Sequence, residues 1–368
     1  MRCTDNRDRI HDTERHGADR RRMERRRRER MRQRRRRRQR RAAALLICIV
    51  LILGAAVTGG VIFFGGLENH TLDYEKEHYN AAAFEGALFA SDLCVTSGEV
   101  ELGGYQPDDE LHAAGLFDLE QESVLCGYRL YDRLYPASTT KIMTAYCAFK
   151  YGNMEDVVTV SANATDFADD EVTSGLKTGD EVTMYDLVCG LLLHSGNDCA
   201  AAIAEHISGS TEEFAVLMNR EAAALGATGT HFVNPHGLHD EDHYTTAYDL
   251  YLIFNACIKD ERFVEIISMD SYDGALKGAD GTTRKETWTP TQAYGAGTAD
   301  EPEGVRVLGG KTGTTRKAGN CVILYDQDVE EHPYISVIMG ADGVEMLYEQ
   351  MNALMEAGIT GTDADAGQ

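Results

Sequence analysis

A serine and a lysine lie three residues apart in the segment Pro136–Lys141, where an apolar helical pattern begins. A serine hydroxyl is a weak nucleophile until a base takes its proton. Residues i and i+3 share one face of a helix, so Lys141 can reach Ser138. Lys141 can act as the base if burial or a nearby cation lowers the pKa of its amine. A helix-capping serine beside a solvated lysine is the alternative, and this pair alone does not decide between them.

A second polar group, Ser195-Gly196-Asn197, interrupts two apolar segments that are each predicted to be helical. A turn followed by a helix cap would explain these residue types. In a functional interpretation, Ser195 supplies a second hydroxyl that exchanges protons with Lys141, and the Asn197 amide holds a substrate peptide bond. Both interpretations stay open from these residues alone.

A third motif, GGKTGT at residues 309–314, stands at the end of a predicted strand. Lys311 and Thr312 offer a cation and a hydroxyl, and the glycines allow a substrate strand to approach closely, which suits binding of an anionic group. A glycine-rich turn is the alternative. A phosphate-binding loop is excluded, because its first glycine would fall on Val305.

The elements around these motifs predict one two-lobed domain. Apolar runs separated by a polar turn predict a hairpin over residues 113–130, and strands are expected at 304–308, 320–326 and 334–338. Apolar residues at helical spacing predict helices at 139–151, 185–194, 197–207, 211–225, 247–259 and 344–357. Strands at both ends with helices between them indicate an α/β (α+β) fold, in which a helical lobe is inserted into a sheet.

Together and in this order, S-x-x-K, S-x-N and K-T-G form the signature of the penicillin-interacting serine enzymes. From about Ala113 to Met355 the chain resembles the low-molecular-weight penicillin-binding proteins of the serine D-alanyl-D-alanine carboxypeptidase family, the S11 peptidases. The similarity includes YPASTTKIMTAY, LLLHSGNDCAAA and GGKTGTTRKAGNCVIL. It implies a β-lactamase/transpeptidase-like fold, with an antiparallel sheet flanked by helices and an inserted all-helical lobe.

The resemblance implies a role for each motif in the hydrolysis of peptides that end in D-alanyl-D-alanine. The expected catalytic residues are Ser138 as nucleophile, Lys141 as base and Ser195 as proton relay. Substrate binding is expected from five residues: Asn197, Lys311, Thr312, Gly313 and Thr314. The backbone N–H groups of Ser138 and Thr314 would form the oxyanion hole. The implied partners are peptidoglycan stem peptides, with β-lactams as inhibitors, and no cofactor is implied.

Other functions use the same motifs. A serine β-lactamase needs rapid deacylation, often helped by a glutamate after S-x-N, but no E-x-x-L-N run is present. A D,D-endopeptidase or transpeptidase differs in the substrate or acceptor that its groove selects, which the sequence does not reveal. A non-catalytic β-lactam sensor is a further alternative, and the three intact motifs argue against it.

Five residues suggest a metal site, because imidazole and carboxylate are common ligands: His236, His239, His243, Asp240 and Asp242. The same segment matches a loop of the S11 family that holds no metal. We therefore expect no metal here.

Charge divides the chain into two unequal parts. Residues 1–41 contain 20 Arg and 7 acidic residues, whereas the whole chain has a net charge of −24. Residues 42–64 carry no charge, and at about 1.5 Å per residue they can cross a hydrocarbon core of about 30 Å. The Arg-rich flank should stay in the cytoplasm. We expect a single-pass anchor in the cell membrane, with a cleaved signal peptide as the alternative.

The expected organisation has five parts: a cytoplasmic arm (1–41), a transmembrane anchor (42–64), an extracytoplasmic stalk (65–111), a catalytic domain (112–358) and an acidic polar tail (359–368). No basic cluster recurs after the anchor, so nucleic acid is not an expected partner. The nine cysteines show no zinc-binding spacing, and a disulfide is possible without an identifiable pair.

Overall fold

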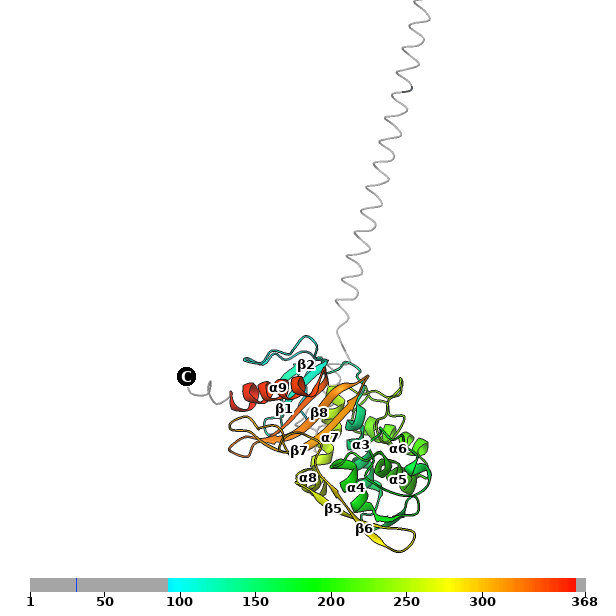
Figure 1. Cartoon of the computed structure of the whole chain (residues 1–368). Coiled ribbons are helices and arrows are strands. Elements are labelled where there is room, and N and C mark those ends of the chain that lie inside the picture. The colour runs from blue at the N-terminus through cyan, green and yellow to red at the C-terminus, as the bar shows by residue number, and fades with distance from the viewer. Residues whose placement is uncertain (1–30, 32–91, 362–368) are drawn as a thin grey trace, which may run out of the picture. The chain divides into compact units, whose positions relative to one another are not determined.

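The computed structural model of the protein describes Met31 and residues 92–361 (Figure 1). Most of the predicted arm, the predicted anchor, residues 65–91 of the predicted stalk and residues 362–368 lie outside the described residues. In the part that is described, no helix has the length and apolar character needed to cross a bilayer.

A five-stranded antiparallel sheet forms the centre of the domain, with the strand order β2-β1-β9-β8-β7. Its strands come from both ends of the domain: β1 (Ala113–Asp118), β2 (Ser123–Tyr128), β7 (Arg306–Thr315), β8 (Gly319–Gln327) and β9 (Pro333–Ala341). β7 lies at an edge and pairs only with β8 in this sheet. Its outer side therefore presents backbone groups that an extended peptide can pair with.

Successive residues of the central strands point to opposite faces, and each face has its own core. Leu116 and Ile338 belong to a core closed by α9 (Val344–Met355), which lies across the sheet (Figure 1). Phe117 and Val337 belong to a larger core shared with the helical lobe. Because both faces are covered, β1 and β9 read as nearly continuous apolar runs.

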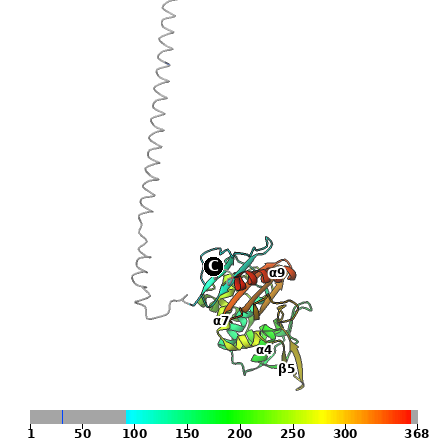
Figure 2. The ribbon, with the colours of Figure 1, turned by 90° about the vertical axis from the view of Figure 1, so that its left-hand side faces the viewer.

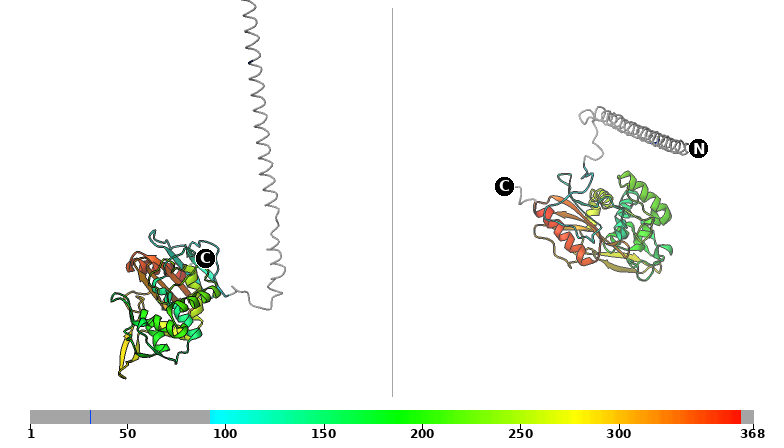
Figure 3. Two further views of the ribbon diagram at one scale, coloured as in Figure 1. Left: turned by 90° about the vertical axis from the view of Figure 1, so that its right-hand side faces the viewer. Right: turned by 90° about the horizontal axis from the view of Figure 1, so that it is seen from above.

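The chain between β2 and β7 forms a lobe of helices beside the sheet (Figures 2 and 3). Its helices are α3 (Lys141–Tyr151), α4 (Met184–Leu192), α5 (Asn197–Ser208), α6 (Thr211–Ala224), α7 (Ala247–Ile258) and α8 (Glu261–Ile267). Four of them begin at a side-chain oxygen that accepts a backbone N–H of the first turn, which stabilises the helix start: Thr183, Ser210, Thr246 and Asp260. The single turns are η1 (Ala137–Thr140), η2 (Asn163–Thr165) and η3 (Glu356–Thr360).

A second antiparallel sheet, with the order β3-β4-β5-β6, lies in the inserted lobe. Its strands are β3 (Val157–Thr159), β4 (Glu181–Thr183), β5 (Tyr272–Lys277) and β6 (Thr283–Trp288). The expectation of an all-helical lobe is therefore wrong in this detail. β5 and β6 alternate between exposed and covered residues, so most of their side chains are polar and their sequence lacks an apolar run.

The structure confirms the main predicted architecture: the hairpin near residue 113, the antiparallel sheet and the six predicted helices. One correction concerns the glycine-rich motif. The strand predicted to end at residue 308 continues to Thr315, so Lys311 lies within β7 and not in a turn after it. Glycine is uncommon inside a strand, but in β7 the missing side chains allow the close contacts described below.

Residues 92–111, predicted as the end of the stalk, pack onto the domain. Leu111 is buried, and Val100 forms an antiparallel bridge with Gly127 of β2. The backbone N–H of Cys94 donates to the Tyr251 hydroxyl at 2.8 Å. The packed domain therefore begins before residue 112. All seven cysteines of the described residues are free and buried.

Candidate active site

Ser138 lies in the single 3-10 turn η1, immediately before α3. Residues i and i+3 eclipse in such a turn, and Lys141 Nζ lies 3.0 Å from Ser138 Oγ. Ala137 adopts a left-handed conformation with φ of 48°, and the Thr140 hydroxyl donates to its carbonyl at 2.8 Å. A Cβ on Gly237 would lie 1.9 Å from the same carbonyl oxygen, so only glycine fits against this turn. The predicted nucleophile and base are in contact.

Lys141, the first residue of α3, is fully buried. Its Nζ also donates to Asn197 Oδ1 and to the His236 carbonyl, each at 2.7 Å. Burial, and then the positive charge of Lys311, hold the pKa of Lys141 well below its usual range. A neutral amine has two N–H groups, which match these two acceptors, and its lone pair then faces the Ser138 hydroxyl. This is the geometry of a general base beside its nucleophile.

The Ser195-Gly196-Asn197 group lies at the break between α4 and α5, as predicted. Ser195 is buried and has a φ of 64°, which is uncommon for a residue with a side chain. In this conformation, Ser195 Oγ accepts a hydrogen bond from Lys311 Nζ at 2.9 Å. Asn197 is the first residue of α5, and its side-chain oxygen accepts a hydrogen bond from Lys141 Nζ. The break between α4 and α5 therefore contacts both lysines of the site, Lys311 through Ser195 and Lys141 through Asn197.

The edge strand β7 carries the third motif of the site. Lys311 is fully buried, and burial lowers its pKa to about 7. Its Nζ also donates to the Thr312 carbonyl at 2.8 Å. A Cβ on Gly313 would lie 2.8 Å from the Pro136 carbonyl and 2.9 Å from the Ser138 nitrogen, so glycine lets β7 pack directly against η1.

Two threonines of β7 bond to neighbouring side chains of the described residues. Thr312 Oγ1 lies 2.7 Å from Thr291 Oγ1, and Thr314 Oγ1 donates to Asn320 Oδ1 at 3.0 Å. Thr314 is exposed, whereas Gly313 is buried. All eight residues predicted from the three motifs therefore lie on η1, α3, the α4–α5 break or β7.

A family profile described as D-alanyl-D-alanine carboxypeptidase, Peptidase S11, matches residues 105–343. The chain belongs to the S11 peptidase family. This match includes all three motifs and extends over both lobes, which confirms the family predicted from the motifs.

Curated S11 relatives align over part of their length. The D-alanyl-D-alanine carboxypeptidase DacF of Bacillus subtilis is 35% identical over 49% of this chain and 46% of its own length. The DacA enzyme of Haemophilus influenzae is 30% identical over 68% of this chain and 62% of its own, and the DacC enzyme of Escherichia coli is 31% identical over 74% and 67%. The chain thus spans about half to two thirds of these relatives.

Two solved structures share the fold. A mutant of the Streptomyces K15 DD-transpeptidase matches with a TM-score of 0.63 and 26% identity, over 69% of this chain and all of that one. A D-alanyl-D-alanine carboxypeptidase of Mycobacterium tuberculosis matches with a TM-score of 0.62 and 26% identity, over 71% of this chain and 96% of that one. The β-lactamase/transpeptidase-like fold expected from the motifs is confirmed.

The histidines considered as metal ligands have other contacts in this S11 domain. His236 provides its backbone carbonyl to Lys141, and its ring meets Phe167 edge-on with the centroids 5.5 Å apart. His243 Nε2 lies 2.8 Å from Thr140 Oγ1, and its Nδ1 accepts the Val233 N–H at 3.0 Å. Among the described residues, no three His, Cys, Asp or Glu side chains gather as a metal site.

Two groups of the site have no counterpart in the motif analysis. One is the His236 carbonyl, a backbone acceptor that carries no side-chain signal. The other is Asp198, which is buried directly after Asn197 and accepts backbone N–H groups from Ser174, Leu176 and Cys199 at 2.8–3.0 Å. The position of Asp198 directly after S-x-N is its only sequence signal.

Proposed function

We propose that the protein is a serine D-Ala-D-Ala carboxypeptidase that removes the terminal D-alanine from peptidoglycan stem peptides, and that β-lactams inhibit it. The observation that carries the proposal is the contact between Ser138 and a fully buried Lys141 whose pKa is held low. A lysine in that state can take the serine proton near neutral pH. Membership of the S11 family, and relatives named D-alanyl-D-alanine carboxypeptidase, support the proposal.

The first chemical step is acylation of Ser138. Neutral Lys141 takes the hydroxyl proton, and Ser138 Oγ attacks the carbonyl carbon of the penultimate D-alanine. The resulting oxyanion is held by the backbone N–H groups of Ser138 and Thr314, each worth on the order of 10²–10³ in rate. The peptide C–N bond then breaks, and a proton passes from Lys141 through Ser195 to the leaving amine. Free D-alanine leaves, and the acyl group remains as an ester on Ser138.

The second step is hydrolysis of that ester. A water molecule gives a proton to Lys141 and attacks the same carbonyl carbon. The C–O bond to Ser138 breaks, and Ser138 Oγ recovers its proton, which restores the free enzyme. A β-lactam follows the first step only, since opening its ring leaves the nitrogen attached and the ester is slow to hydrolyse.

The edge strand β7 is the proposed substrate-binding strand. An extended stem peptide can pair with the outer backbone groups of β7, opposite the Ser195–Asn197 turn. The terminal carboxylate then meets Lys311 and Thr312, and a buried cation binds a carboxylate strongly. Asn197 holds the substrate amide. Gly313 keeps β7 close enough to η1 for both oxyanion donors to reach one oxygen.

A DD-transpeptidase is the second candidate, because a structure of that name shares the fold over its whole length. The two reactions share the acyl-enzyme and differ in whether water or an amine accepts the acyl group. Adding an amino-acid acceptor to the assay separates them, since a transpeptidase would convert substrate to the amine product in preference to the acid.

We also propose that residues 42–64 anchor the protein in the cell membrane. The uncharged segment follows an Arg-rich arm, which favours a cytoplasmic N-terminus and an extracytoplasmic domain. Proteolysis of intact spheroplasts tests this. Removal of the catalytic domain by added protease is expected, whereas protection of that domain would overturn the proposed orientation.

The activity is tested by release of D-alanine from an acyl-D-Ala-D-Ala peptide. We expect release by the full-length protein, and a loss of more than about 10³-fold in the Ser138→Ala variant. The exposed Ser97 provides the control, because Ser97→Ala removes a hydroxyl outside the site. No release by the wild type would overturn the carboxypeptidase proposal. Many turnovers of penicillin per molecule would instead identify a β-lactamase.

A further inference from the structure

The segment Val172–Asp180, here called the support loop, packs against the Ser195–Asn197 turn. The backbone N–H of Asn197 donates to the Val172 carbonyl at 2.9 Å. A Cβ on Gly196 would lie 2.0 Å from Ser174 Oγ, so the turn and the support loop are in direct contact. The position of Asn197 therefore depends on where the support loop lies.

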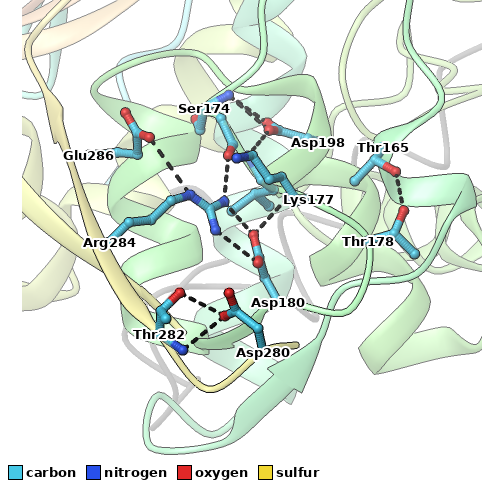
Figure 4. A network of polar contacts seen from close by, with 12 residues as sticks. Thr165, Ser174, Lys177, Thr178, Asp180, Asp198, Asp280, Thr282, Arg284 and Glu286 are labelled. Atoms are coloured by element: carbon cyan, nitrogen blue, oxygen red, sulfur yellow. Dashed lines mark hydrogen bonds and ion pairs between the residues drawn. The ribbon is translucent and has the colours of Figure 1, made fainter. Parts of the chain in front are cut away.

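Asp198 fastens the support loop to the start of α5. Its carboxylate is almost fully buried and accepts the N–H groups of Ser174 at 2.8 and 2.9 Å and of Leu176 at 3.0 Å. Figure 4 shows this carboxylate facing the backbone of the loop. Since Asp198 follows Asn197 directly, any shift of the loop pulls on the first turn of α5.

The opposite side of the support loop is held by β6 (Figure 4). Arg284 binds both carboxylate oxygens of Asp180, at 2.9 and 2.5 Å, and donates to the Gly175 carbonyl at 2.7 Å. The indole N–H of Trp288 donates to the Ser174 carbonyl at 3.1 Å. Asp180 is almost fully buried and Arg284 is only partly exposed, so water competes little for the carboxylate of this bidentate pair.

The hairpin of β5 and β6 is also joined to α4, where the Tyr272 hydroxyl donates to Asp186 Oδ1 at 2.7 Å. Its pairing with β4 is limited to Glu181 and Lys277, whose side chains form an exposed ion pair at 2.6 Å. Exposed ion pairs contribute little to stability. Arg284 and Lys277 thus bind adjacent carboxylates: Asp180, which is buried, and Glu181, which is exposed.

We propose that Arg284 is a positioning residue, which holds the support loop and through it fixes Asn197 against Lys141. This inference rests on the proposed function, because it assigns Asn197 and Lys141 to the reaction. Arg284 itself touches neither the nucleophile nor the base in the described structure. The contacts to the terminal carboxylate come from β7 on the other sheet and do not depend on Arg284, whereas Asn197 contacts the base Lys141 and would also hold the substrate amide. Loss of Arg284 should therefore lower kcat more than it raises KM.

The test compares Arg284→Met with Lys277→Met in the full-length protein. We expect Arg284→Met to lower kcat about 10–100-fold, since small displacements of reacting groups cost that much, with KM within about threefold of wild type. Lys277→Met should stay within about twofold in both constants. Arg284→Lys keeps the charge but not the bidentate contact, and should restore part of the lost kcat.

Asp180→Asn serves as the second variant where Arg284→Met folds poorly. The folded fraction of each variant is counted by the amount of labelled penicillin bound at saturation, and kcat is expressed per labelled site. A wild-type kcat for both Arg284→Met and Asp180→Asn, or an equal loss in Lys277→Met, would overturn the inference. A rise in KM with kcat unchanged would also overturn it.

Failure of the proposed function gives a different result. If the wild type releases no D-alanine but is labelled by penicillin, the carboxypeptidase proposal fails and the role of Arg284 is read from the labelling rate. A labelling rate at least about tenfold slower in Arg284→Met than in Lys277→Met supports the inference, and equal rates overturn it. A wild type that shows neither reaction overturns both.

Discussion

Lys141 and Lys311 are both fully buried and each contacts a serine of the site, yet their surroundings differ. Lys141 begins helix α3, where the positive end of the helix dipole disfavours a cation. The charge of Lys311 lowers the pKa of Lys141 further. Lys311 lies in a strand, where burial alone lowers its pKa to about 7.

This difference shows how one residue type can fill two roles. Desolvation acts on both amines. For Lys141 the charge of Lys311 and the helix dipole add to it, and the Asp198 carboxylate opposes them in part. Lys141 is therefore suited to accept a proton from Ser138. Lys311 becomes charged readily once a carboxylate enters the site, because an opposite charge raises the pKa of an amine.

The largest effect is expected from substitutions at Lys141. Both Lys141→Met and Lys141→Arg should lower kcat/KM by about 10³-fold or more, because a guanidinium keeps its proton at any accessible pH. The wild-type rate should also fall about tenfold per pH unit below the Lys141 pKa. The rates of D-alanine release and of penicillin labelling measure both the loss in the variants and the pH dependence of the wild type. Activity of Lys141→Arg within tenfold of wild type would assign the base to another group.

Substitutions at Lys311 should have an intermediate effect that depends on the substrate carboxylate. Loss of a hydrogen bond to a charged group costs about 1.5–3 kcal/mol, so Lys311→Met should lower kcat/KM roughly 10–150-fold. Lys311→Arg keeps the charge and should recover part of this loss. With a substrate whose terminal carboxylate is amidated, the difference between the wild type and Lys311→Met should be much smaller. A full loss with the amidated substrate too would place Lys311 in the chemical step.

The sequence predicts Ser138 and Lys141 as a pair because they lie three residues apart on one turn. It does not by itself bring Lys311 and Ser195 together, since these residues are far apart in the chain and meet only through the fold. That convergence followed from the family resemblance, and the contact at 2.9 Å agrees with it. The antiparallel sheet was predictable because its strands are apolar runs bounded by turns.

The parts that the sequence did not predict have physical reasons. β6 reads TRKETW, and its structural importance comes from Arg284 binding a distant carboxylate, which no local pattern indicates. A glycine-rich turn is only the alternative interpretation of the motif around Lys311, and no local pattern shows that Gly313 is needed inside a strand because Ser138 lies so close to it. The acceptor at His236 is a main-chain carbonyl, which any residue could provide.

The smallest effect concerns stability, and it tests whether burial of Lys311 is costly. Its pKa is about 7 in the folded protein and about 10.4 in an unfolded chain. Between these values the unfolded state binds more protons, so this group makes the unfolding free energy rise with pH in that window. Its destabilising effect is fully present below pH 7 and is lost near pH 10.

Lys311→Met should therefore unfold at a higher temperature than the wild type at pH 6, by about 2–4 °C for each kcal/mol removed, and the difference should shrink as the pH approaches 10. Scanning calorimetry of both proteins over this pH range measures it. Titrating groups other than Lys141, whose pKa depends on the charge of Lys311, cancel in the difference. The exposed Lys285 provides the matched control, since Lys285→Met should give a difference that does not change with pH. If the Lys311→Met difference were equally independent of pH, Lys311 would keep its proton in the folded protein, and its contrast with Lys141 would have to come from its contacts alone.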